Sequence, residues 1–340
     1  MNRKDQHIAY ALRYQSPYNA FDDMELLQSS LPEISPHQVD LSTTVLGEKW
    51  AFPFYINAMT GGSAKAEKVN HKLAQVALAC DLVMVTGSYS AALAGQEPAS
   101  FHLRESYPDL RLATNIGLDK TPEQAQTVVA AMQPLFLQVH VNLMQELLMP
   151  EGEREFSNWL QHLNRYPKEV TSPLMLKEVG FGMDPETLAR AQAAGFKAVD
   201  ISGRGGTSFA FIENQRSSHG RDYLNDWGQT TPLALLRSQP YQEQLEVLAS
   251  GGIRQPLDMV KAFVLGAKAV GLSRTILEMV ERQPLEEVIA QVKAWKEDLR
   301  LLMTALNAAS IDQLKDRPYL LYGRLKEAWE QVSGEIACKK

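Results

Sequence analysis

Five polar residues that could bind a ligand lie within nine positions of one another. Residues 135–142 alternate between apolar and polar side chains, which predicts a β-strand with one polar face. The polar residues of this strand and of the segment that follows it are Gln138, His140, Asn142, Gln145 and Glu146. Polar groups on an apolar strand are costly to bury unless they meet partners, water or a ligand. The spacing therefore predicts that the strand brings a histidine, amides and a carboxylate to one place.

Glu146 is the candidate metal ligand. A single carboxylate beside phosphate oxygens suits Mg²⁺, which takes one or two protein carboxylates and keeps several waters. The alternative is a glutamate placed in the first turn of a helix, where the helix dipole favours negative charge. His140 by itself would more often be structural, but its polar neighbours on the same face favour ligand binding.

Glycine-rich turns follow the later predicted strands. Residues 202–208 combine three glycines with hydroxyls and an arginine, so that backbone N–H groups could cradle an anion. Residues 250–254 and 271–274 form a matched pair of turns that end in Arg254 and Arg274. In many barrels the loops after strands seven and eight bind phosphate. We therefore expect a phosphate-bearing cofactor, and the alternative is that both arginines form surface ion pairs.

Lys177 interrupts the apolar run 173–179. Lysine is rarely buried without a partner. Either it lies on an edge strand and reaches solvent, or it meets an anionic cofactor group or an electron-rich ring.

These residues need a scaffold that places successive strand ends together. Short apolar strands alternate with amphipathic helices, which are expected over residues 64–79, 121–132, 184–194 and 256–265. The expected strands are 52–59, 82–86, 111–116, 135–142, 173–179, 198–202, 245–250 and 268–272. Eight such units predict an α/β fold of the (β/α)8 TIM-barrel type, with a doubly wound open sheet as the alternative.

The whole chain is expected to form a single domain. Residues 1–50 read as a polar, irregular N-terminal arm, 51–283 as the barrel and 284–340 as extra C-terminal helices packed outside it. The arm begins with Arg3 and Lys4, which suggest either a solvated tail or a basic lid over an anionic substrate.

Composition excludes several classes of protein. The 340 residues carry a net charge of -6, which gives no sign of a nucleic-acid surface. Two cysteines far apart in sequence exclude a disulfide scaffold. The N-terminus lacks the apolar segment of a signal peptide, and no apolar run approaches a membrane span. We expect a cytoplasmic protein with no membrane partner and no nucleic-acid partner.

Several motifs together resemble the FMN-dependent, type 2 isopentenyl-diphosphate isomerases, and they extend over nearly the whole chain. The matching segments are Arg3-Lys4-x-x-His7-Ile8, Met59-Thr60-Gly61-Gly62, Gly87-Ser88, Asn115-Ile116-Gly117, His140-x-Asn142-x-x-Gln145-Glu146, Pro150-Glu151-Gly152, Lys177-Glu178-Val179-Gly180-x-Gly182, residues 202–208 and Ser250-Gly251-Gly252. The resemblance implies a TIM barrel with FMN at its mouth that converts isopentenyl diphosphate to dimethylallyl diphosphate. It also implies Mg²⁺, NADPH or NADH as the flavin reductant, and a homotetramer or homo-octamer.

The resemblance also implies roles for residues. Those that would contact FMN are Ala58, Met59, Thr60, Ser88, Asn115, Lys177, Ser202, Thr207, Gly251, Gly252, Arg254, Ser273 and Arg274. Those that would contact the substrate are Arg3, Lys4, His140, Asn142 and Gln145, with Glu146 on Mg²⁺. No side chain is assigned as the catalytic acid or base, because the family gives that role to reduced FMN.

The chain departs from the family after the second strand. Many members have Gly-Ser-Gln-Arg there, whereas this chain has Tyr89 and Ser90 in the last two positions. An arginine that often helps to hold the diphosphate is therefore missing, and Arg204 or an arginine of a neighbouring subunit could replace it.

The first rival reading is an FMN-dependent 2-hydroxy-acid oxidase or dehydrogenase. That chemistry needs a histidine base close to an arginine on a late loop, but residues 202–209 contain Arg204 and no histidine. His219 lies too far along the chain to match.

Two further readings are less consistent with the sequence. A nucleotide dehydrogenase barrel would need a loop cysteine, and both Cys80 and Cys338 are misplaced for it. A non-catalytic flavin-binding protein would need neither the Gln145-Glu146 pair nor the basic arm.

Overall fold

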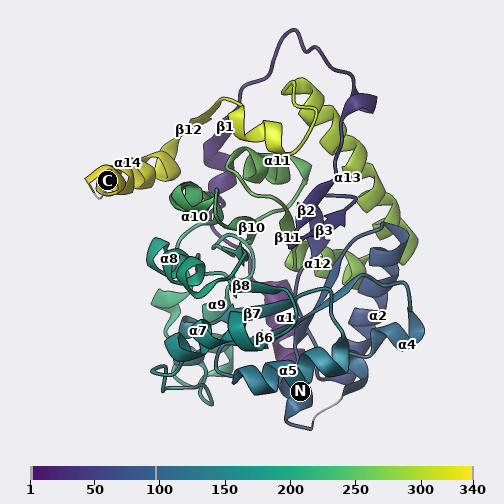
Figure 1. Ribbon diagram of the computed structural model, residues 1–340, viewed down its shortest axis with the longest axis vertical. Coiled ribbons are helices and arrows are strands. Elements are labelled where there is room, and N and C mark those ends of the chain that lie inside the picture. Colours follow the sequence, from purple (N-terminus) through teal and green to yellow (C-terminus); the bar gives the residue numbers. More distant parts are fainter. Residues whose placement is uncertain (1–2, 96–97, 339–340) are drawn as a thin grey trace.

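A closed barrel of parallel strands forms the centre of the protein (Figure 1). The computed structural model describes residues 3–95 and 98–338, and within these ranges eight strands follow one another around the barrel in chain order. They are β4 (Phe54–Ile56), β5 (Met84–Ser88), β6 (Leu112–Gly117), β7 (Leu137–Val141), β8 (Leu174–Glu178), β9 (Ala198–Asp200), β10 (Glu246–Ser250) and β11 (Val270–Leu272). The prediction of a barrel rather than an open sheet is confirmed.

Helices follow the strands and cover the barrel. Those that pack against it or lie in the loops are α2 (Ala64–Ala79), α3 (Ser90–Leu93), α4 (Leu103–Ser106), α5 (Pro122–Met132), α6 (Leu143–Leu148), α7 (Trp159–Glu169), α8 (Pro185–Ala194), α9 (Phe209–Arg216), α10 (Thr231–Ser238), α11 (Pro256–Val264) and α12 (Arg274–Arg282). Side chains of Thr121 and Asp184 cap the first backbone N–H groups of α5 and α8, and proline follows each cap. Both helix starts agree with the sequence prediction.

The N-terminal segment is more regular than predicted. It forms α1 (Arg3–Arg13), β1 (Met24–Leu26) and a hairpin of β2 (Thr43–Val45) and β3 (Glu48–Trp50). Trp50 of the hairpin stacks on Phe136 with ring centroids 6.1 Å apart and makes an edge contact with Tyr55. The hairpin therefore closes the end of the barrel at which the strands begin. The prediction of an irregular arm is wrong here, because three-residue strands are too short to show a periodic pattern.

The C-terminal segment packs outside the barrel. It comprises α13 (Leu285–Ala305), β12 (Tyr319–Leu321) and α14 (Gly323–Cys338). Figure 1 shows α13 along one side of the molecule beside α2 and α11, and α14 next to α10. Strand β12 pairs antiparallel with β1, which ties the two ends of the chain together.

Short 3-10 helices fill several of the remaining connections: η1 (Ala20–Asp23), η2 (Pro36–Gln38), η3 (Pro98–Ser100), η4 (Asp222–Leu224), η5 (Gln239–Tyr241) and η6 (Asp312–Asp316). No helix in the described part of the chain is both long enough and apolar enough to cross a membrane.

Candidate functional site

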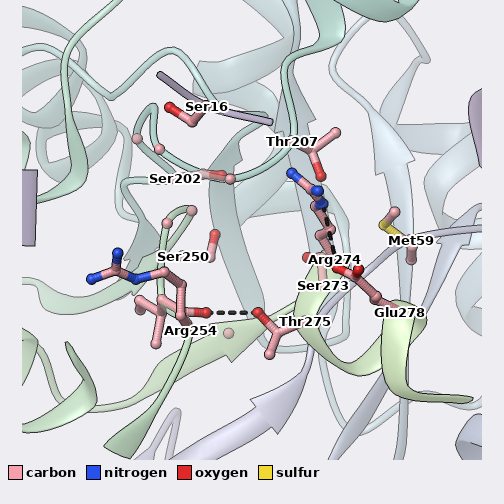
Figure 2. Close-up of a pocket in the computed structure, with 18 of the residues that line it drawn as sticks. Ser16, Met59, Ser202, Thr207, Ser250, Arg254, Ser273, Arg274, Thr275 and Glu278 are labelled. Atoms are coloured by element: carbon pink, nitrogen blue, oxygen red, sulfur yellow. Dashed lines mark hydrogen bonds and ion pairs between the residues drawn. The ribbon is translucent and has the colours of Figure 1, made fainter. Parts of the chain in front are cut away.

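A cavity of about 570 Å³ lies at the C-terminal ends of the barrel strands, which is within the usual size range of ligand pockets. Ten of the thirteen predicted cofactor residues line it: Ala58, Met59, Lys177, Ser202, Thr207, Gly251, Gly252, Arg254, Ser273 and Arg274. Figure 2 shows several of them around the cavity, with the loops after β9 and β10 beside the start of α12. Residues from five different strand ends therefore meet around one space.

Glycines let the loops after β9 and β10 approach each other backbone to backbone. A Cβ atom built on Gly251 would lie only 1.9 Å from the carbonyl oxygen of Gly203. One built on Gly206 would lie 2.9 Å from the backbone nitrogen of Gly252. Any side chain at these positions would push the loops apart, so the glycines allow the two backbones to pack closely, and the anion cradle stays a prediction.

Buried polar atoms without hydrogen-bond partners mark the cavity as a ligand site. In the cavity lining, Arg274 Nε and Thr207 Oγ1 are buried and have no hydrogen-bond partner among the described residues, although Arg274 Nε lies 3.9 Å from Glu278 Oε2 as an ion pair. Burial lowers the pKa of Arg274, and the residue begins α12, where backbone N–H groups favour an anion. Buried polar groups are normally satisfied, so these atoms fit a polar ligand such as the phosphate and ring edge of FMN.

Arg254 differs from Arg274. Its guanidinium contacts Asp22 at 2.5 Å and Asp258 at 3.0 Å, and these two carboxylates raise the pKa of Arg254. Both arginines therefore make ion pairs, the close ones of Arg254 and a longer one between Arg274 Nε and Glu278 Oε2 at 3.9 Å, and both line the cavity.

Lys177 is buried in the barrel wall and faces the cavity. Strand β8 lies between β7 and β9, so an edge strand with a solvent-exposed lysine is excluded. Its Nζ donates to the carbonyl oxygen of Glu178 at 2.6 Å. Burial lowers the pKa of Lys177, whereas the charges of Asp200 and Glu178 raise it.

Three predicted cofactor residues lie outside the cavity lining. Thr60 precedes α2, and Ser88 lies opposite Asn115 in the register of β5 and β6. Ser88 Oγ donates to Ser90 Oγ at 2.9 Å. The third, Asn115, is a predicted cofactor residue that contacts a predicted substrate residue, because its Oδ1 lies 2.7 Å from His140 Nδ1.

The polar residues that follow β7 contact one another beyond the cavity lining. Asn142 Nδ2 donates to Glu146 Oε1 at 2.7 Å, and Glu146 Oε2 accepts from the backbone nitrogen of Glu153 at 2.7 Å. Among the described residues, no group of three or more histidine, cysteine, aspartate or glutamate side chains could hold a metal. Both carboxylate oxygens of Glu146, the predicted Mg²⁺ ligand, thus already accept hydrogen bonds within this segment.

The structure adds Glu213, which the sequence reasoning missed. This fully buried residue of α9 accepts from Gln145 Nε2 at 3.1 Å, lies 3.0 Å from His7 Nε2 and is ion-paired with Arg216. Burial would raise the pKa of Glu213, but hydrogen bonds and charges from these partners lower it overall. The available signal was a glutamate within the largely apolar segment 209–213.

The N-terminal arm reaches this side of the barrel through α1. His7 joins α1 to α9 through Glu213. Arg3 and Lys4, the predicted substrate residues of the arm, begin α1, but their side chains lie outside the described residues.

The structure does not bring the suggested replacement arginine to the cavity. Tyr89 packs on Phe101 with ring centroids 4.9 Å apart, and the lining excludes Arg204, whose Nη1 lies 3.9 Å from Asp226.

Two solved structures with a similar fold are variants of a flavocytochrome b2 and of a mandelate oxidase. A flavocytochrome b2 variant with benzoylformate aligns with a TM-score of 0.68 at 20% identity, covering 95% of this chain and 84% of that one. A mandelate oxidase variant with 2-hydroxy-phenylacetamide aligns with a TM-score of 0.65 at 15% identity, covering 94% and 91%. At these identities the likeness shows the fold alone.

Sequence comparison is more specific. The family profile described as FMN-dependent dehydrogenase matches residues 10–96 and 103–320. The isopentenyl-diphosphate delta-isomerase of Streptococcus gordonii is 60% identical over 331 residues, covering 97% of this chain and 99% of that protein. The enzyme of the same name from Streptococcus mutans is 60% identical over 330 residues, with the same coverage. The chain therefore belongs to the isopentenyl-diphosphate delta-isomerase family, on the barrel of the FMN-dependent dehydrogenases.

Proposed function

We propose that this chain interconverts isopentenyl diphosphate and dimethylallyl diphosphate with FMN held at the barrel mouth. The observation that carries the proposal is the 60% identity, over nearly the full length, to proteins named for this activity. The cavity supports it, because the closely packed glycine loops and the buried Arg274 Nε, which makes no hydrogen bond, fit a phosphate-bearing cofactor.

Residues in different parts of the site would bind the cofactor and the substrate. The glycine loops, Ser273 and Arg274 would hold the FMN phosphate, and Lys177 would face the ring. His140, Asn142 and Gln145 would hold the substrate, and Glu146 would bind a Mg²⁺ ion carried by the diphosphate. Reduced FMN, when bound, would supply the acid–base group that an unactivated alkene requires. The protein itself would bind the diphosphate, away from the reacting carbons, and would thereby hold the alkene in position against the flavin.

Further details belong to the proposal. The side chains of Arg3 and Lys4 would close over the diphosphate as a basic lid, with α1 positioned by the contact between His7 and Glu213. NADPH or NADH would reduce the flavin. A homotetramer or homo-octamer in the cytoplasm stays a prediction.

A direct assay tests the activity. The purified protein should have a yellow flavin spectrum. Incubated without oxygen with isopentenyl diphosphate, Mg²⁺ and NADPH, it should form dimethylallyl diphosphate. A colourless protein that FMN does not reconstitute would contradict the proposal.

A single substitution tests the metal site. Glu146→Gln removes the charge that would hold Mg²⁺, so turnover should fall at least about tenfold and need more Mg²⁺, while FMN stays bound. Glu186→Gln is the matched control, since Glu186 also lies in the first turn of a helix after a strand but on the exposed face of α8. Loss of flavin from the Glu146→Gln protein would make Glu146 structural instead.

The 2-hydroxy-acid oxidase reading has support from the family profile and the shared fold. However, His219, the nearest candidate base in sequence, contacts Ser218 Oγ on the exposed surface and is absent from the cavity lining. A yellow protein that oxidises lactate-like acids and leaves isopentenyl diphosphate unchanged would favour that reading.

A further inference from the structure

A layer of polar side chains lies inside the barrel, between the apolar layer around Trp50 and Phe136 and the candidate site. Tyr55, Asn57, Gln138, Asp200 and Ser250 are all at most 2% exposed. The inside of such barrels is usually filled with branched apolar side chains, and buried polar groups persist only where hydrogen bonds satisfy them. This layer contains a fully buried carboxylate, Asp200, which lies below the candidate site at the end of β9.

The side chain of Asp200 accepts hydrogen bonds from several neighbouring residues. It accepts from Tyr55 Oη at 2.9 Å, from Asn57 Nδ2 at 2.8 Å and from Ser250 Oγ at 2.9 Å, and also from the backbone nitrogen of Ser202. The oxygens of Asp200 act as acceptors towards all of these donors, and Asn57 accordingly turns its NH₂ group towards Asp200. The backbone nitrogen of Ala58 donates to Asn57 Oδ1 at 2.8 Å and fixes the same orientation independently.

A directed chain of side-chain amides runs from Asp200 to the substrate side of the site. Asn57 Oδ1 accepts from Gln138 Nε2 at 3.1 Å, and Gln138 Oε1 accepts from Asn115 Nδ2 at 3.3 Å. Asn115 Oδ1 then lies 2.7 Å from His140 Nδ1. Each amide has its acceptor at one end and its donors at the other, so the orientation set at Asp200 passes along the chain.

The last contact determines a proton position. Because Asn115 Oδ1 only accepts, His140 Nδ1 must carry the hydrogen. The other tautomer would place a nitrogen lone pair against a carbonyl oxygen, or would require every amide to flip until Asn57 Oδ1 faced the carboxylate of Asp200. His140 Nε2 lies on the side of Gly117, 3.2 Å from where a Cβ atom of that residue would be.

We propose that Asp200 is a positioning residue that holds His140 in the Nδ1–H tautomer through Asn57, Gln138 and Asn115. In the neutral ring Nε2 then accepts hydrogen bonds, and it can donate to a diphosphate oxygen only after taking up a proton. The assignment of His140 to the substrate rests on the proposed function, whereas the tautomer rests on the contacts alone.

Nitrogen-15 NMR of histidine-labelled, FMN-free protein tests the tautomer, measured well above the ordinary histidine pKa of about 6.5. The His140 signal is identified by its loss in His140→Gln. In the wild type, the neutral ring should show the protonated nitrogen at Nδ1. Asp200→Asn and Gln138→Met should each raise the Nε2–H fraction, the first by removing the anchor and the second by interrupting the chain. Gln138→Met leaves Asp200 in place and serves if Asp200→Asn does not fold.

Thr86→Val is the matched control. Thr86 is fully buried in the same interior and bonds Thr114 at 2.8 Å, and no hydrogen bond joins this pair to the amide chain among the described residues. The tautomer ratio of His140 in the Thr86→Val protein should equal that of the wild type. A wild-type ring protonated at Nε2, variants with an unchanged ratio, or an equal change in Thr86→Val would each overturn the proposal. If only the isomerase assay failed, the tautomer result would still stand. Only the proposal that His140 binds the diphosphate substrate would be lost.

Discussion

The two arginines at the cavity have the same residue type but different surroundings. Arg254 is paired with both Asp22 and Asp258 at 2.5–3.0 Å, whereas Arg274 Nε makes no hydrogen bond among the described residues and lies 3.9 Å from a single carboxylate, that of Glu278. A partly buried guanidinium whose Nε makes no hydrogen bond is better suited to bind an anionic ligand than one held by close contacts with two carboxylates.

Replacement of Arg274 should therefore weaken FMN binding. Arg274→Gln removes charge-assisted hydrogen bonds worth about 1.5–3 kcal/mol, so the dissociation constant should rise about 10- to 100-fold. Quenching of flavin fluorescence during titration measures it. Arg190→Gln, on the exposed face of α8, should leave the constant unchanged. Equal affinities for the Arg274→Gln protein and the wild type would place the phosphate elsewhere.

Glu178 is a buried carboxylate that shapes the loop after β8. Its Oε2 accepts from the backbone nitrogens of Gly180 at 2.7 Å, Gly182 at 3.2 Å and Phe181 between them. Burial raises the pKa of Glu178 from 4.5 to about 7, although these N–H groups and Lys177 act in the opposite direction. A raised pKa contributes stability that is complete below pH 4.5 and is lost as the pH rises to about 7.

Glu178→Gln should remove this pH dependence. The wild type should lose on the order of 3 kcal/mol of stability, relative to the variant, between about pH 5 and about pH 8, because ionisation of a buried carboxylate is unfavourable. Thermal unfolding of both proteins across this range measures the difference. Parallel curves would show that Glu178 ionises as easily in the folded protein as in the unfolded chain.

At the scale of elements, the loops after β9 and β10 depend on close approach of their backbones. Gly251 has a φ of +93° and its missing Cβ would overlap the carbonyl oxygen of Gly203. Two separate requirements, a left-handed backbone and empty space, therefore act on the same residue.

A pair of substitutions separates these requirements. Gly251→Ala should abolish or strongly weaken FMN binding, because the two loops must separate to make room. Gly47→Ala is the control, since Gly47 has a similar φ of +81° but nothing within 4 Å of its Cβ position. It should cost only about 1–2 kcal/mol of stability from the backbone term and should retain flavin. Equal flavin affinity for the two variants would contradict the role given to loop packing.

For the whole molecule, the arm joins the barrel through both polar and apolar contacts. Ile8 and Ala11 of α1 are at most 2% exposed, and His7 meets the buried Glu213 of α9. A buried ion-pair network that loses one member leaves its other groups unsatisfied. The docking of α1 should therefore depend on Glu213.

Hydrogen exchange measures this dependence. In Glu213→Gln, amides of residues 5–13 should exchange faster than in the wild type, while those of β7 and β8 should be unchanged. Glu281→Gln is the control, because Glu281 makes only longer, partly exposed contacts with Lys65 and Lys72. Unchanged exchange in α1 would show that its apolar residues alone hold it in place.

The sequence by itself determined the barrel and identified ten of the residues that line the cavity. Strand and helix periodicity, proline after a helix cap and glycine-rich turns are local signals, and the eight predicted strands all overlap observed ones. Ten predicted cofactor residues meet at one cavity because parallel strands of a barrel end on the same face.

Only the tertiary structure decided which of these polar groups contact one another. Barrel closure and strand register place Asn115 against His140, Gln138 against Asn57, and His7 of the arm against Glu213. The ion pair of Arg254 with Asp22 likewise joins segments distant in the chain. Periodicity carries no information on such pairings, because they depend on how many residues separate the elements and on how the strands align after closure.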